Sequence, residues 1–196
     1  MLATLARHAL LRSGANSVAA TPALGGSIVA TEALVNMADY PINATLEIIL
    51  LALQAFQVLF LWAHDWVPLG RLNDVAAVRS QDSLRRLVIV TLVQSVPWSI
   101  GLAGSLCYFR VPYPAWLQHW LWDSYLILLC GEFYAWWLPY LFRADPPRAA
   151  RYRIMFGQTH AFLPQRNGMA PNTLHVALHS ATLITMVLLI YLFGLI

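Results

Sequence analysis

The chain has 196 residues, of which 59% are apolar and only 11% are charged, and its mean hydropathy is +0.60. Soluble domains carry roughly 45–50% apolar and about 25% charged residues, so this composition excludes an ordinary soluble globular protein. The net charge of +3 comes from arginines in short segments beside apolar runs, which is a pattern of membrane topology and not of nucleic-acid binding.

Residues 1–44 are predicted to form an N-terminal tail. Its first part contains no acid but holds Arg7 and Arg12, and Arg12 interrupts the apolar core that a secretory signal needs. The apolar positions within residues 2–9 could form one face of an interfacial helix. Residues 17–38 are a weak candidate for a fifth span, because a proline, two adjacent glycines and a glutamate interrupt them. Both alternatives stay open.

The rest of the chain, residues 45–196, is predicted to be an all-α integral membrane protein, a four-helix transmembrane bundle. About 20 consecutive apolar residues are needed to cross the hydrocarbon core as a helix. Four stretches meet this requirement, at about residues 46–67, 87–109, 115–142 and 174–196. Asn172 or Thr173 should cap the last of these helices, directly after Pro171.

The second and third spans should be adjacent and antiparallel, because only Arg110–Pro114 connects them. Pro97 should kink the second span, since proline removes a backbone donor and clashes with the preceding turn. Gly101 and Gly104 could let a neighbouring helix approach closely.

Two loops, residues 68–86 and 143–173, carry four and five arginines. They must lie on the same side of the membrane, and the positive-inside rule places that side in the cytoplasm of a cell inner membrane. The N-terminus then lies outside, unless residues 17–38 form a span. Aromatic residues and prolines in the second loop predict a structured cytoplasmic cap, with an interfacial helix near residues 152–156.

This topology places four of the six histidines, His64, His160, His175 and His179, near the cytoplasmic face. His175 and His179 are four residues apart on one helical face, as two nitrogen ligands of one ion would be. The candidate ligands for a transition metal are these four histidines together with Glu132. The histidines are also candidate ligands for haem. The alternative is that the histidines contact lipid head groups, water or loop backbone.

Glu132 is an ionisable residue inside a predicted span, which costs from about 3 kcal/mol upward unless it has a partner or is protonated. Gln54, Gln57 and Gln94 are candidate partners from other helices. Such a residue is either a polar contact between helices or part of a proton or substrate path.

Three functional hypotheses remain, and the sequence does not decide whether the protein is an enzyme. The first is a non-catalytic protein or accessory subunit of a larger membrane complex. The second is a metal- or haem-binding membrane redox protein or enzyme. The third is a proton or small-solute carrier centred on Glu132. Expected partners are the lipid bilayer and a second copy or other membrane subunits, and no nucleic acid. No nucleotide-binding or metalloprotease motif is present.

Overall fold

A computed structural model describes residues 44–142 and 145–194 of the chain. The predictions for the N-terminal tail therefore fall outside the described residues, except at Ala44. Within the described ranges every regular element is helical, apart from one isolated β-bridge between Arg166 and Met169. The predicted all-α fold class is confirmed for this part of the chain.

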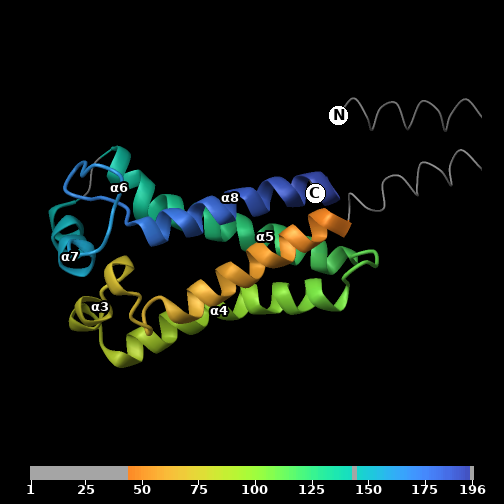
Figure 1. Ribbon diagram of the computed structural model, residues 1–196, viewed down its shortest axis with the longest axis horizontal. Helices are drawn as coiled ribbons and strands as arrows, with labels where there is room; N and C mark the ends of the chain where they lie inside the picture. The colour runs from red at the N-terminus through yellow and green to blue at the C-terminus, as the bar shows by residue number, and fades with distance from the viewer. Residues whose placement is uncertain (1–43, 143–144, 195–196) are drawn as a thin grey trace, which may run out of the picture. The chain divides into compact units, whose positions relative to one another are not determined.

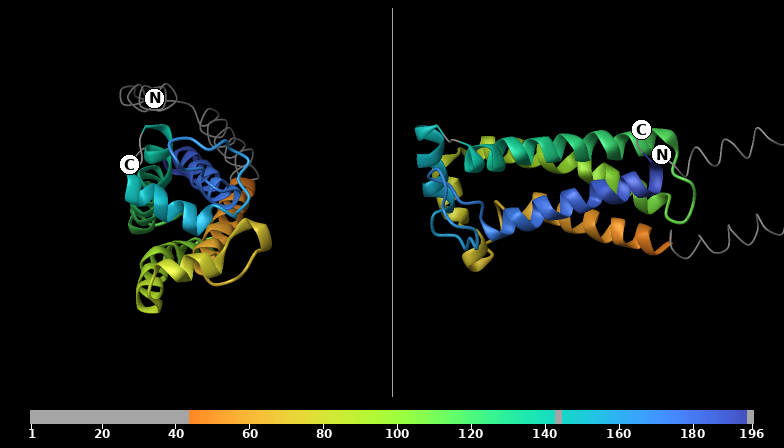
Figure 2. Two further views of the ribbon diagram at one scale, coloured as in Figure 1. Left: turned by 90° about the vertical axis from the view of Figure 1, so that its left-hand side faces the viewer. Right: turned by 90° about the horizontal axis from the view of Figure 1, so that it is seen from above.

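Long helical segments run side by side in the unit Asn43–Ile196 (Figure 1 and Figure 2). They are the helix Ala44–Ala63, α4 (Leu84–Cys107), α5 (Ala115–Glu132) and α8 (Thr173–Phe193). A π-helical turn, η2 (Phe133–Trp137), and the short α6 (Leu138–Leu141) continue α5. α5 packs against both α4 and α8, which makes it the shared partner of these two helices.

Three of these helices are long and apolar enough to cross a membrane: Ala44–Ala63, Leu84–Cys107 and Thr173–Phe193. A fourth is added only if Ala115–Leu141 and Pro146–Phe156, which are bent by 105°, are taken as one span. The helices begin and end within a few residues of the four predicted spans.

Glycines in α4 provide the close approach to α5. A Cβ atom built on Gly104 would lie 2.6 Å from Cδ1 of Leu117, and one on Gly101 would lie 3.1 Å from Cδ2 of Leu121. α4 is one helix through Pro97, whose carbonyl oxygen accepts a hydrogen bond from Nε1 of Trp120 at 3.0 Å. Small residues and an indole hydrogen bond therefore fix the predicted pairing of the two helices.

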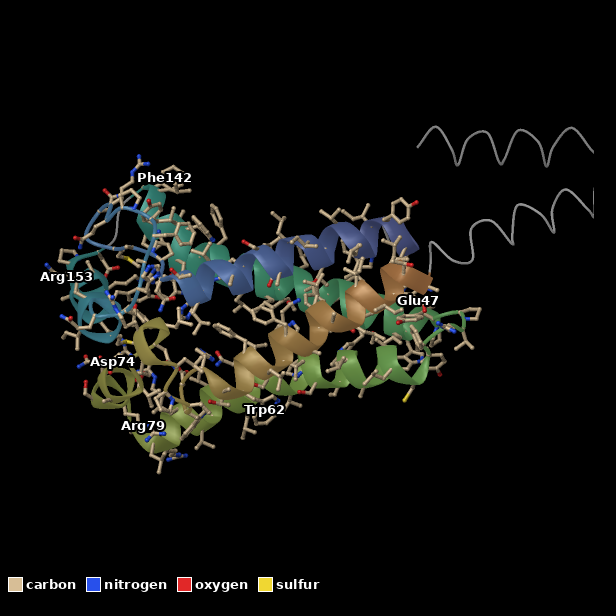
Figure 3. The ribbon with its side chains drawn as sticks, viewed as in Figure 1. Glu47, Trp62, Asp74, Arg79, Phe142 and Arg153 are labelled. Carbon is tan, nitrogen blue, oxygen red and sulfur yellow. The ribbon has the colours of Figure 1, made fainter. Side chains whose placement is uncertain are left out.

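The two arginine-rich segments meet at one end of the bundle, which we call the arginine-rich end (residues 68–86 and 145–172). It holds η1 (Gly70–Leu72), α3 (Val75–Gln81) and α7 (Pro146–Phe156), and α3 packs against α7. Figure 3 shows Arg79 and Arg153 at this end and Glu47 at the other.

The loop between α7 and α8 is held by specific hydrogen bonds. The backbone N–H of His160 donates to the carbonyl of Arg71 at 2.6 Å. The Asn167 amide donates to the carbonyls of Tyr140 and Phe142, both at 2.9 Å. The loop therefore has a defined structure over the helix ends.

Candidate functional site

A pocket of about 580 Å³, which we call the end pocket, opens at the arginine-rich end. Its walls come from the segment after the helix Ala44–Ala63 and from α3, α4, η2, α7 and α8. Polar side chains make up much of its lining: His64, Asp65, Asp82, Arg86, Gln94, Arg148, Arg151, Tyr152 and His175. Such a concave site with converging polar groups is the usual form of a binding or reaction site.

Two buried carboxylates of the end pocket have basic partners. Oδ2 of Asp82 lies 2.5 Å from a guanidinium nitrogen of Arg151, and Oδ1 lies 3.1 Å from Arg86. Oδ1 of Asp65 lies 3.4 Å from Nε2 of His64. Burial raises the pKa of Asp65 above its ordinary value of 3.8, His64 opposes the rise, and the nearby Asp82 adds to it. Asp65 therefore takes up a proton more readily than an exposed aspartate.

The hydrogen bonds of His175 determine which ring nitrogen carries its proton. Oδ1 of Asn172 accepts from the backbone N–H of His175 at 2.9 Å, and the Asn172 amide nitrogen donates to the carbonyl of Leu72 at 3.3 Å. The same Oδ1 lies 2.6 Å from Nδ1 of His175, so Nδ1 must be the donor. The neutral ring therefore keeps an unprotonated Nε2.

His64 has the same arrangement. Its Nδ1 lies 3.0 Å from the carbonyl oxygen of Phe60, which can only accept, so Nδ1 donates. The rings of His64 and His175 have centroids 5.7 Å apart and lie nearly perpendicular. Two imidazoles from different parts of the chain thus stand together with Nδ1 anchored. Nε2 of His64 faces Oδ1 of Asp65, with which it can exchange a proton, and Nε2 of His175 is the nitrogen without a proton in its neutral ring.

A second cavity of about 330 Å³, which we call the interior cavity, adjoins the end pocket between the helices and also borders the exposed Val93 and Ile127. The two cavities share His64, Gln94, Trp136 and His175 in their walls, and the interior cavity also reaches Glu132 and His179. The two cavities therefore lie next to each other between the arginine-rich end and Glu132.

Glu132 is only 6% exposed and has no ion-pair partner among the described residues. Its Oε1 lies 2.8 Å from the hydroxyl of Thr182, whereas its buried Oε2 has no hydrogen-bond partner in the described part of the chain. Burial without a cationic partner among the described residues favours the neutral, protonated carboxyl, because a buried charge is costly unless it is paired.

A series of buried polar side chains continues beyond Glu132. The Thr182 hydroxyl lies 3.4 Å from Oε1 of Gln57, and Nε2 of Gln57 donates to Thr185 at 2.9 Å. Gln57 is thus a partner of α8. The sequence suggested it as a direct partner of Glu132, but in the described residues both side chains instead contact Thr182. The side-chain amide of the equally buried Gln54 makes no hydrogen bond within the described residues.

His179 carries its proton on the opposite nitrogen from His175. The indole Nε1–H of Trp137 can only donate, and it lies 3.0 Å from Nδ1 of His179. The neutral ring therefore has its proton on Nε2. The two rings are 6.2 Å apart between centroids but are held by different partners.

The structure brings four of the five predicted site residues together. His64, His175, His179 and Glu132 all line the interior cavity. His160 is exposed in the loop, where its Nδ1 lies 2.7 Å from the Thr173 hydroxyl, and it lines neither cavity. Nothing in the sequence pattern identified Trp137 or Asp82 as part of this arrangement, because both reach it only through tertiary packing.

No group of three or more His, Cys, Asp or Glu side chains among residues 44–142 and 145–194 is placed to hold a metal ion. Binding of an ion at Nδ1 of His179 would also displace the Trp137 hydrogen bond. The transition-metal or haem site therefore stays a prediction.

No protein-family model matches the chain, and comparisons with curated proteins and with solved structures find no match.

Proposed function

We propose that the chain is a multi-pass protein of the cell inner membrane that binds and carries protons, with Glu132 as the central proton-binding group. In this proposal the helix Ala44–Ala63, α4, α5 with its continuation and α8 are the four spans. The arginine-rich end faces the cytoplasm, in agreement with the positive-inside rule.

Insertion is supported by the apolar faces that the helices turn outward. In the most apolar 18-residue stretch of the three long apolar helices, only 28%, 28% and 39% of residues are buried. Leu59, Val93, Ile127 and Val187 are examples of exposed apolar side chains on the four helices. Monomeric soluble proteins rarely expose continuous apolar surface on this scale, whereas lipid would cover it.

The observation that carries the proton-binding role is the environment of Glu132. An ionised carboxylate in the middle of a span would cost at least about 3 kcal/mol, and none of the described residues places a cation beside this one to reduce the cost. A carboxyl group that is neutral at rest and reaches a cavity is suited to binding and releasing a proton.

In this proposal the proton passes along the two adjoining cavities and the titratable side chains that they share. Asp65 and His64 stand at the end pocket, His175 lies beside His64, and the interior cavity extends from these groups to Glu132. Imidazoles exchange protons near neutral pH, which suits them to the intermediate positions. Four helices leave little space for a complete path, so a second copy or a larger membrane complex is expected to complete it.

An accessory subunit without proton chemistry would also account for the helical bundle. It would give no reason, however, for a buried carboxyl that lines a cavity and has one oxygen without a partner among the described residues. Glu132 therefore favours the proton-binding role.

The test uses the protein reconstituted into liposomes that contain a pH-sensitive dye. A potassium diffusion potential should drive proton entry in the unsubstituted protein, and Glu132→Gln should reduce the rate at least tenfold. Asp123→Asn is the matched control, because Asp123 is an exposed acid on the same helix and should have little effect. Infrared spectra should show a protonated-carboxyl band that Glu132→Gln removes.

Equal flux in the unsubstituted protein and in Glu132→Gln would exclude the carrier role. A protonated-carboxyl band that is unchanged in Glu132→Gln would exclude a protonated Glu132.

A further inference from the structure

A groove of about 580 Å³, separate from the end pocket, lies between α8 and the segment formed by α5, η2 and α6. Its walls are mostly apolar and include Phe133, Trp137 and Leu183, with His179 and Ser180 as its polar groups. We call it the lateral groove. Its volume lies within the roughly 300–1,000 Å³ that is usual for small-molecule sites.

We propose that the lateral groove binds a lipid-soluble molecule with a planar carbonyl head, of the quinone class, and that His179 donates the hydrogen bond to the carbonyl oxygen. The inference rests on the membrane insertion proposed above, and does not depend on proton binding by Glu132.

The first argument is an unused hydrogen-bond donor. Because Trp137 donates to Nδ1 of His179, the neutral ring carries its proton on Nε2. This Nε2–H has no acceptor among the described residues. Only 6% of the surface of His179 is exposed. Nε2 of His179 is not one of the fully enclosed polar atoms, so the carbonyl oxygen of a bound ligand could reach it and accept its hydrogen bond.

The second argument is the chemistry of the walls. Phe133 and Trp137 lie in the π-helical turn and both line the groove, so that a flat ring could stack on an aromatic face. Among the described residues, no Asp, Glu, Lys or Arg side chain lines the groove. A charged ligand would therefore lose its hydration without compensation, whereas a neutral carbonyl compound needs only the one donor.

The third argument is the position of His179 between two spaces. It lines both the lateral groove and the interior cavity, which also contains Glu132. A carbonyl head in the groove would thus be separated from Glu132 by the His179 imidazole.

The test uses the full chain in lipid nanodiscs and a photoreactive analogue of decylubiquinone as the probe. Crosslinks should concentrate on the peptides that contain Phe133–Leu141 and His179–Leu183, and unlabelled decylubiquinone should compete. His179→Phe should reduce this specific labelling about tenfold, as loss of one hydrogen bond of about 1.4 kcal/mol predicts.

Two further variants separate binding from folding. His179→Gln can accept from Trp137 and still donate to the ligand, so it should restore most of the labelling. Glu132→Gln should leave labelling unchanged even where it abolishes proton flux, which keeps the two proposals independent.

The groove would hold only bulk acyl chains if labelling were spread over all lipid-facing helices, were not competed by unlabelled decylubiquinone and were unaffected by His179→Phe. That result would overturn the inference, as would equal loss in His179→Phe and His179→Gln with normal helicity.

Discussion

Oδ1 of Asn172 accepts two hydrogen bonds from His175, one from the backbone N–H at 2.9 Å and one from Nδ1 at 2.6 Å. The first bond caps α8 at its N-terminus, and the second fixes the proton position of the imidazole. One side chain therefore determines both where the last helix begins and which nitrogen of His175 is free to exchange protons.

Asn172→Ala should lower the free energy of unfolding by about 2–4 kcal/mol. Loss of a helix cap costs about 1 kcal/mol, and a buried imidazole N–H left without an acceptor costs about 1–3 kcal/mol more. Denaturation in detergent micelles measures the change. Ser83→Ala removes the cap of α4 without affecting a histidine and should cost only about 1 kcal/mol. Equal effects of the two substitutions would show that the imidazole bond contributes nothing.

Gly104→Ala should destabilise the bundle by about 1–3 kcal/mol, because the new methyl group would lie 2.6 Å from Leu117 and force α4 and α5 apart. Gly131→Ala provides the comparison, since a Cβ there meets nothing within 4 Å. It should be neutral or slightly stabilising, as alanine favours the helix. Thermal unfolding of both variants tests the prediction, and a Gly104→Ala protein as stable as Gly131→Ala would contradict the close α4–α5 approach.

The pKa of Asp65 predicts a pH dependence of stability. Because the folded-state pKa is raised above 3.8, the folded protein binds this proton more tightly than the unfolded chain does. The free energy of unfolding should therefore fall as the pH rises from 3.8 through the folded-state pKa of Asp65. Above the folded-state pKa, the full cost of ionising the largely buried carboxyl is present. Asp65→Asn should remove this part of the pH dependence. Unfolding midpoints measured between pH 4 and pH 7 would show it, and parallel curves for both proteins would refute it.

Cysteine labelling tests membrane insertion. Cys130 is exposed on the surface of α5, so a water-soluble charged maleimide would reach it unless lipid covers it. In a Cys107→Ser background within intact membranes, Cys130 should react with an apolar maleimide and not with a charged one. A cysteine introduced at the exposed Gln165 should react with the charged reagent only after the cells are permeabilised. Rapid reaction of Cys130 with the charged reagent would rule out insertion of α5.

The long helices could be predicted because uninterrupted apolar runs and their boundaries at Pro68, Arg110–Pro114 and Pro171 are local features. The π-helical turn Phe133–Trp137 could not, since nothing in its composition distinguishes it from the α-helix around it. Helix α3 was missed for a related reason. It has seven residues and is stabilised by its cap at Asp74 and by packing on α7.

The candidate site could be predicted as far as it depends on residue type and on position along each helix. The HxxxH spacing and the isolated acid in a span identified His175, His179 and Glu132. The rotation of each helix about its axis decides the partners, and a single sequence does not give it. The sequence therefore did not give the hydrogen bond of His175 to Asn172 or its contact with His64. It also did not give the hydrogen bond of His179 to Trp137 or that of Glu132 to Thr182.

The hydrogen bonds from His160 to Arg71 and from Asn172 to Leu72 join loops about a hundred positions apart in the chain. Their consequence concerns the order of assembly during synthesis. The first helix and α4 can pair as soon as both have been synthesised, but the end pocket and the surroundings of Glu132 need residues of α8. Until α8 is added to the growing chain, the polar side chains that line these sites are expected to lack their final partners.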